Sequence, residues 1–185
     1  MPNRKFKYFL GWEIKNYKSL FKNISEETNT ILTSPNAGGN SVRSEAYAFE
    51  WLYRYKNARK VVTENDVVYF HVEWKKVDFI TTIGSYNYGI SVTRVLPFKQ
   101  EDYDNLDEFV SRLLYKKLNG LVIARTGVSE EHSFESSILF CWCPSVQIKE
   151  LTHRIFKKSK LLNEGVELIT MIAPRYSLLK DFRFE

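Results

Sequence analysis

Cysteine and histidine are scarce in this chain of 185 residues, which has two cysteines and three histidines. The cysteines form the run Cys141-Trp142-Cys143. In a strand, side chains two residues apart project to the same face, and a disulfide between such neighbours is strained. No Cys-x-x-Cys pair is present and the histidines are scattered, which argues against a zinc site. We therefore expect two free core thiols in a reducing compartment.

Several other signatures are missing. No apolar run approaches the roughly 20 residues that a membrane-spanning helix needs, and the N-terminus lacks the apolar segment of a secretory signal. There is no phosphate-binding loop, no dinucleotide-binding fingerprint and no readable Ser-His-Asp or Cys-His set. The sequence predicts a soluble intracellular protein, located in the cytoplasm or nucleus, with no membrane partner.

The composition is that of a globular chain, with 44% hydrophobic and 15% aromatic residues. A single domain spanning residues 1–185 is long enough to bury a substantial core. The net charge of +5 is concentrated at the N-terminus, in Arg4, Lys5 and Lys7 and in lysines that follow them. This basic extension, residues 1–40, is compatible with nucleic-acid contact or with a solvated amphipathic helix.

Apolar spacing and turn residues predict the order of elements. The expected helices cover residues 6–23, 41–57, 104–118 and 145–162, the second beginning at a Ser41 cap and the third ending at Gly120. The expected strands are 60–63, 67–72, a hairpin within 77–95, 138–142 and 166–173, and residues 24–41 are expected to form a loop. This order indicates an α/β domain with a mixed sheet of about five strands flanked by helices, preceded by an extra N-terminal helix.

Asp78 lies near the start of the apolar hairpin, where a carboxylate must be hydrated, paired or metal-bound. A two-residue turn at Tyr86-Asn87 would place Asp78 on one face with Ser91 and Thr93. A three-residue turn would instead bring Arg94 to that side. The competing interpretation is that Asp78 caps a turn or forms an ordinary salt bridge with Arg94 or Lys76.

Glu45 belongs to the sheet-facing stripe of the helix expected at 41–57, so its carboxylate should point toward the sheet. Two acids that converge there could hold Mg²⁺, which prefers hard oxygen ligands. Alternatively, Glu45 is an early helical acid that complements the helix dipole.

The element order α-β-β-β-α-β, with Glu45 on the first helix and Asp78 opening a hairpin, resembles the PD-(D/E)XK fold of restriction-endonuclease-like nucleases. The run Gly89-Ile90-Ser91-Val92-Thr93-Arg94 and the later segment Leu113 to Gly120 also resemble a group of uncharacterised eukaryotic and viral proteins with the same fold. The resemblance covers roughly residues 41–173.

The resemblance implies Mg²⁺ binding by Asp78, with Glu45 as the accessory helical acid. The family's acid-x-Lys signature should fall at Ser91-Val92-Thr93, where both charged residues are missing. Two other segments could supply the missing charged residues. Glu73-Trp74-Lys75 is a literal acid-x-Lys, but it precedes Asp78; alternatively, Lys116 or Lys117 on the following helix supplies the cation.

The sequence thus predicts a nucleic-acid-binding protein of nuclease-like fold, with Mg²⁺-dependent phosphodiester hydrolysis as its first interpretation. The alternatives are a catalytically inactive relative that binds nucleic acid or a protein partner in a larger assembly, and a pure protein-interaction domain. The expected catalytic set is Asp78, Glu45, Lys116, Lys117, Ser91 and Thr93. The expected nucleic-acid contacts are Arg4, Lys5, Lys7, Arg43 and Arg94.

Overall fold

A computed structural model describes residues 24–35, 41–71, 74–159 and 164–173. The helices are α2 (Glu26–Thr33), α3 (Val42–Lys56), α4 (Gln100–Asp104), α5 (Leu106–Gly127) and α6 (Val146–Lys158), with a short 3-10 helix η1 (Glu130–His132). The strands are β1 (Ala58–Thr63), β2 (Phe79–Ile83), β3 (Tyr86–Arg94), β4 (Ser136–Cys143) and β5 (Val166–Ile172). The helix expected at residues 6–23, with Arg4, Lys5 and Lys7 beside it, lies outside the described residues.

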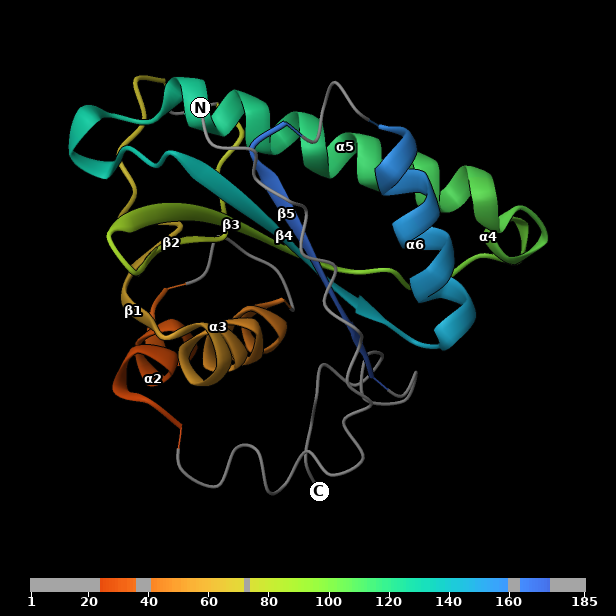
Figure 1. Cartoon of the computed structure of the whole chain (residues 1–185), viewed down its shortest axis with the longest axis horizontal. Coiled ribbons are helices and arrows are strands. Elements are labelled where there is room, and N and C mark those ends of the chain that lie inside the picture. Colours follow the sequence, from red (N-terminus) through yellow and green to blue (C-terminus); the bar gives the residue numbers. More distant parts are fainter. Residues whose placement is uncertain (1–23, 36–40, 72–73, 160–163, 174–185) are drawn as a thin grey trace.

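The five strands form one sheet in the order β1-β2-β3-β4-β5. The pairs β1–β2 and β2–β3 are antiparallel, and β3–β4 and β4–β5 are parallel. Helices α5 and α6 make the two parallel crossovers and lie on one face of the sheet, while α2 and α3 lie on the other (Figure 1). The predicted α/β fold with a five-stranded mixed sheet is confirmed.

One half of the core lies between α3 and the sheet. Phe49 and Leu52 of α3 are fully buried against Ile90, Phe140 and other residues of the central strands. The indole Nε1 of Trp142 donates a hydrogen bond to the carbonyl oxygen of Ser44 at 3.1 Å. This bond fixes the first turn of α3 over β4, and the next residue in that turn is Glu45.

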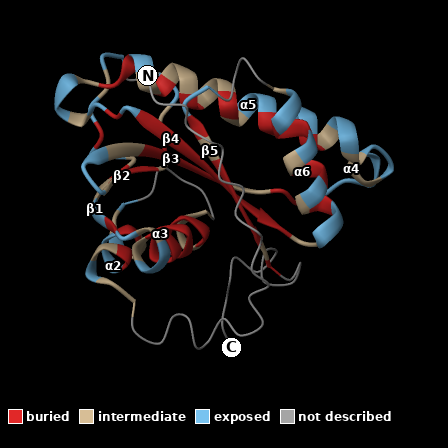
Figure 2. Ribbon diagram, in the orientation of Figure 1, coloured by how far each residue is buried: buried red, intermediate tan, exposed pale blue. Residues whose placement is uncertain are grey.

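The other half of the core lies between the sheet and helices α5 and α6. Leu114, Leu118 and Leu121 of α5 pack with Leu139 and other residues of β4 and β5. Every residue of β4 is buried, as its unbroken apolar run predicts for a strand covered on both faces. In Figure 2 the buried central strands lie between helices whose outer surfaces are exposed.

The two cysteines are free and buried in β4, in agreement with the prediction. Burial raises the pKa of the Cys143 thiol to about 12 and that of Cys141 well above its usual range. Neither thiol is ionised near neutrality, so both behave as apolar core groups.

The loop predicted for residues 24–41 is wrong in its first half, because residues 26–33 form α2. The Ser25 hydroxyl accepts a hydrogen bond from the Thr28 amide at 3.1 Å and caps the helix. Glu26 and Glu27 complement the helix dipole in the first turn, and Ile31 is buried against the core. Tertiary burial of one face therefore overcame a polar, weakly helical composition.

The strand predicted at 67–72 is also wrong. Its described part makes only an isolated bridge, Tyr69 to Val128, outside the sheet. The amide of Phe70 donates to the carbonyl oxygen of Gly127 at 3.0 Å, and the Ser129 amide donates to Val68 at 2.9 Å. These backbone groups are satisfied by the end of α5, so the segment does not join the sheet.

Helix α5 continues seven residues beyond Gly120, where the sequence predicted its end. Leu121 and Ala124 extend the buried stripe past the glycine, and their burial outweighs its low helix propensity. Lys116 and Lys117 consequently lie in the middle of a 22-residue helix rather than at its C-terminus. Complementing the helix dipole is therefore not their role.

The hairpin has a different register from the one expected. Ile83 pairs with Tyr86 and Phe79 pairs with Ile90, so the two-residue turn is Gly84-Ser85 rather than Tyr86-Asn87. Gly84 has a φ of 64°, a conformation that favours glycine. The shift is an even number of residues, so the set of residues sharing each face is the one predicted for a two-residue turn.

Within the described residues, none of the helices combines the length and the apolar character needed to cross a membrane.

Candidate functional site

Three carboxyl groups and a lysine from four different elements influence one another at one end of the sheet. Glu45 comes from the first turn of α3, Glu64 follows β1, Asp78 precedes β2 and Lys117 comes from the middle of α5. We call these four residues the acid–lysine cluster. It joins the two layers of helices through the strand ends between them.

Glu45 is the most buried acid of the cluster, with 8% of its surface exposed. Its pKa is raised to about 7, first by burial and then by the negative charge of Asp78, with a smaller contribution from Glu64. A hydrogen bond with the Ser41 side chain and the charge of Lys117 act in the opposite direction. Ser41 does precede α3, but its hydroxyl makes no hydrogen bond to the helix backbone and serves Glu45 instead.

Asp78 and Glu64 lie side by side because of the sheet register. Thr63 pairs with Phe79, and the residue after β1 is therefore opposite the residue before β2. Burial and the charge of Asp78 raise the pKa of Glu64, while Lys76 and Lys117 lower it. The Asp78 carboxylate accepts a hydrogen bond from the amide of Val92 in β3. Both residues are only partly buried, so water reaches the cluster.

Lys117 brings a positive charge to the same stretch of β3. Its Nζ donates to the Ser91 hydroxyl at 3.3 Å and to the carbonyl oxygen of Val92 at 3.2 Å. Asp78 and Lys117 thus bind opposite polar groups of one residue, Val92. The Lys117 ammonium group therefore lies beside Ser91 and Val92, in the run where the acid-x-Lys signature was expected. Lys117 itself belongs to helix α5.

The other residues predicted for the site are not members of the acid–lysine cluster. Lys116 is exposed, while Thr93 is half-buried on the same face of β3 as Ser91. Arg43 lies in the first turn of α3, and Arg94 ends β3. By strand alternation Arg94 belongs with Ile90 and Val92 on the α3 face, away from Ser91. Glu73, part of the alternative acid-x-Lys run, lies outside the described residues.

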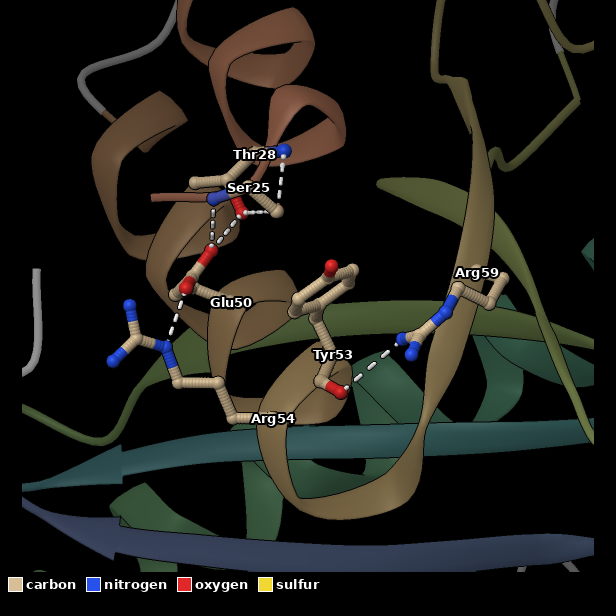
Figure 3. A network of polar contacts seen from close by, with 6 residues as sticks. All are labelled: Ser25, Thr28, Glu50, Tyr53, Arg54 and Arg59. Carbon is tan, nitrogen blue, oxygen red and sulfur yellow. Dashed lines mark hydrogen bonds and ion pairs between the residues drawn. The ribbon is translucent and has the colours of Figure 1, made fainter. Parts of the chain in front are cut away.

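A second buried acid of α3, Glu50, shows what a structural carboxylate looks like in this fold. It accepts hydrogen bonds from the Ser25 amide at 2.9 Å, from the Thr28 hydroxyl at 2.6 Å and from Arg54 Nε at 2.5 Å (Figure 3). Burial alone would raise the pKa of Glu50, but these hydrogen bonds outweigh it and leave the pKa lowered. Glu50 ties α2 to α3, whereas Glu45 is held in a position that disfavours its charge.

The figure also shows how the end of α3 is joined to β1. The Arg59 guanidinium lies over the Tyr53 ring, 4.3 Å from its centroid, and donates to the Tyr53 carbonyl oxygen at 3.5 Å (Figure 3). These contacts belong to the scaffold and are separate from the acid–lysine cluster.

The donor set of the cluster suits a hard divalent cation. Among the described residues, no group of three or more His, Cys, Asp or Glu side chains is arranged to hold a metal ion. Mg²⁺, however, usually keeps several waters and binds through one or two carboxylates. Glu45 and Asp78 supply such a pair, and a cation beside them would relieve the repulsion that raises the Glu45 pKa.

Sequence reasoning missed Glu64 and Tyr69. Glu64 could have been found from the β1–β2 register, because it places an acid opposite Asp78. The Tyr69 hydroxyl accepts a hydrogen bond from the Val77 amide at 2.9 Å and so holds the chain just before Asp78. The pKa of Tyr69 is raised to about 12, mainly by burial and to a smaller extent by the charges of Glu64 and Asp78. The hydrogen bond from the Val77 amide acts in the opposite direction. No local sequence pattern signals that contact.

No family model matches the chain, and no solved structure matches it. The chain is similar to the AAC-rich mRNA clone AAC4 protein of Dictyostelium discoideum, with 32% identity over 133 residues. The alignment covers 69% of this chain but 19% of that protein, so the chain spans about a fifth of the length of its curated relative. The relative's description names no activity, substrate or partner.

Proposed function

We propose that this chain is a nucleic-acid-binding protein with a restriction-endonuclease-like core and that it hydrolyses phosphodiesters with Mg²⁺. The element order α3-β1-β2-β3-α5-β4 supports the fold, since it repeats the α-β-β-β-α-β order of that core. The acid–lysine cluster supports the activity, because the charge of its hairpin acid, Asp78, acts on its helical acid, Glu45.

The observation that carries the proposal is the position of Lys117. Its Nζ contacts Ser91 and Val92, while the Asp78 carboxylate binds the Val92 amide. A nuclease needs a fixed positive charge near its carboxylates, because negative charge grows on the scissile phosphate in the transition state. Lys117 supplies this charge from α5 although Ser91-Val92-Thr93 lacks a lysine.

Each residue has a distinct role in the proposed hydrolysis. Asp78 and Glu45 would hold Mg²⁺, which supplies Lewis-acid stabilisation of the phosphate and lowers the pKa of bound water. Lys117 would contact a phosphate oxygen. Water adds to phosphorus as the bond from phosphorus to the leaving sugar oxygen breaks; solvent water takes the proton of the attacking water and returns one to the leaving oxygen.

Cleavage of labelled DNA and RNA oligonucleotides, with Mg²⁺ and with a chelator, tests the proposal. We expect Mg²⁺-dependent cleavage that falls about 100-fold or more in Asp78→Asn and Glu45→Gln. Asp104→Asn is the matched control, because this exposed acid ends α4, and Lys117 lies eleven residues, or about 16 Å, along α5 from its first residue, Leu106. Loss of activity in the control, or full activity in Asp78→Asn, would contradict the assignment.

A second candidate is a catalytically inactive protein of the same fold that binds nucleic acid or a protein partner. The observation in its favour is the lack of both charged residues of the acid-x-Lys signature at Ser91 and Thr93. It predicts salt-dependent binding to oligonucleotides without cleavage, because phosphate contacts weaken steeply as salt rises.

A further inference from the structure

The segment that leads into Asp78 exposes aromatic side chains. Phe70 has 65% of its surface exposed and Trp74 has 37%. His71 contacts Trp74 edge-on, with ring centroids 5.1 Å apart. We call the described residues Phe70, His71, Trp74, Lys75 and Lys76 the aromatic segment. Exposed aromatic rings grouped in one place are typical of a surface that a partner covers.

The end of α5 holds this segment in place. A Cβ added to Gly127 would lie 1.8 Å from Cε3 of Trp74, so the indole rests directly on the glycine backbone. The Phe70 amide donates to the carbonyl oxygen of the same glycine at 3.0 Å. Trp74 is therefore an ordered ring that is fixed against a helix and still partly open to solvent, as a stacking platform requires.

The aromatic rings are followed by positive charge and then by the acid–lysine cluster. Lys75 is exposed, and the charge of Lys76 acts on the carboxyl group of Glu64. Asp78 follows two residues after Lys76, and its position is fixed by the bond from the Val77 amide to Tyr69. A ligand that contacts both the rings and the lysines therefore lies next to the cluster.

We propose that the aromatic segment binds single-stranded nucleic acid, with unstacked bases on Trp74 and Phe70 and backbone phosphates on Lys75 and Lys76. The proposal rests on the proposed function for its account of the neighbouring phosphodiester site, and it adds the substrate class. Aromatic rings beside a basic stretch match the alternating faces and phosphates of a single strand. In a duplex the base faces are already stacked and not accessible to such rings.

Binding of fluorescently labelled oligonucleotides in a chelator, where no cleavage occurs, tests this proposal. Single-stranded DNA and RNA and a blunt duplex of the same sequence are compared by anisotropy. We expect the single strands to bind more tightly than the duplex. Trp74→Ala should weaken single-strand binding about 5- to 150-fold, the range measured for loss of one stacked base, and Trp74→Phe should restore most of it.

The matched control is Phe98→Ala. Phe98 is as exposed as Phe70, at 66%, but it precedes α4. Helix α4 lies at the end of α5 opposite the one that Gly127 closes (Figure 1), and α5 is about 33 Å long. We expect no change in affinity for this variant. Phe70→Ala provides a second test, because its exposed ring can be removed with little effect on folding, as circular dichroism would verify.

Three results would overturn the proposal: unchanged affinity in both Trp74→Ala and Phe70→Ala, equal losses for duplex and single strand, or no oligonucleotide binding by the wild type. The last result would instead favour a protein partner on this surface. The proposed hydrolysis is tested separately. Single strands that bind through Trp74 but are never cleaved with Mg²⁺ would refute the hydrolysis and leave the binding proposal intact. Conversely, cleavage that is lost in Asp78→Asn but unchanged in Trp74→Ala would refute only the stacking role.

Discussion

Replacing Glu45 by glutamine should stabilise the protein in a manner that depends on pH. The pKa of Glu45 is raised from its ordinary value of 4.5 to about 7, so the folded state disfavours the charged carboxylate. The stability that this group contributes is fully present below about pH 4.5 and is lost as the pH rises to about 7. From the difference in pKa, the loss amounts to about 3 kcal/mol above this window.

The assay is urea or thermal unfolding in metal-free buffer at about pH 5 and about pH 8. Because glutamine stays neutral, Glu45→Gln should gain roughly 2 to 3 kcal/mol at the higher pH and less than about 1 kcal/mol at the lower one. The melting temperature at about pH 8 should then rise by roughly 5 to 10 °C for a domain of this size. Added Mg²⁺ should stabilise the wild type and have little effect on the variant.

Glu50→Gln is the matched control on the same helix. The lowered pKa of Glu50 means that its stabilising contribution is present above its ordinary value of 4.5 and is lost as the pH falls through the folded value. Glu50→Gln should therefore destabilise the protein at about pH 8, since it weakens hydrogen bonds to Thr28, Ser25 and Arg54. An equal change at both pH values in Glu45→Gln, or a destabilisation at about pH 8, would refute the reasoning.

Three further outcomes follow from the packing. Gly127→Ala should displace the Trp74 ring, which the new Cβ would overlap, and lower single-strand affinity in the anisotropy assay; unchanged affinity would show that the ring is not held there. Cys141 and Cys143 should resist a thiol reagent in the native protein and both react in urea, and rapid labelling of the native protein would contradict their burial. Trp142→Phe should reduce the free energy of unfolding by about 1 kcal/mol or more through the lost bond to Ser44, as measured by urea titration.

The sheet and most helices could be predicted because the spacing of apolar residues along the sequence indicates which faces are buried. The unbroken apolar run of β4 and the stripe from Val110 to Leu118 are examples. The failures occurred where tertiary contacts override local signals. Hydrogen bonds from Ser25 and Thr28 to Glu50 hold α2 against α3. Burial of Leu121 stabilises the part of α5 that follows Gly120.

The candidate site could be predicted in part. Asp78 and Glu45 became candidates because an acid in an apolar run and an acid on a sheet-facing helix are visible in sequence, and Lys116 or Lys117 because the expected acid-x-Lys position lacks a lysine. The choice between Lys117 and Lys116 needed the helical phase relative to β3, which the structure provides through the Ser91 contact. Glu64 needed the β1–β2 register, and that register depends on a bulge between Arg59 and Val61.

The most direct test of the central claim compares Lys117→Met with Lys116→Met in the Mg²⁺-dependent cleavage assay. The two lysines are neighbours on α5, but Lys117 reaches Ser91 and Val92 whereas Lys116 is exposed. The account predicts a loss of cleavage of about 100-fold or more in Lys117→Met and near-normal cleavage in Lys116→Met. Equal activity in the two variants would contradict the account.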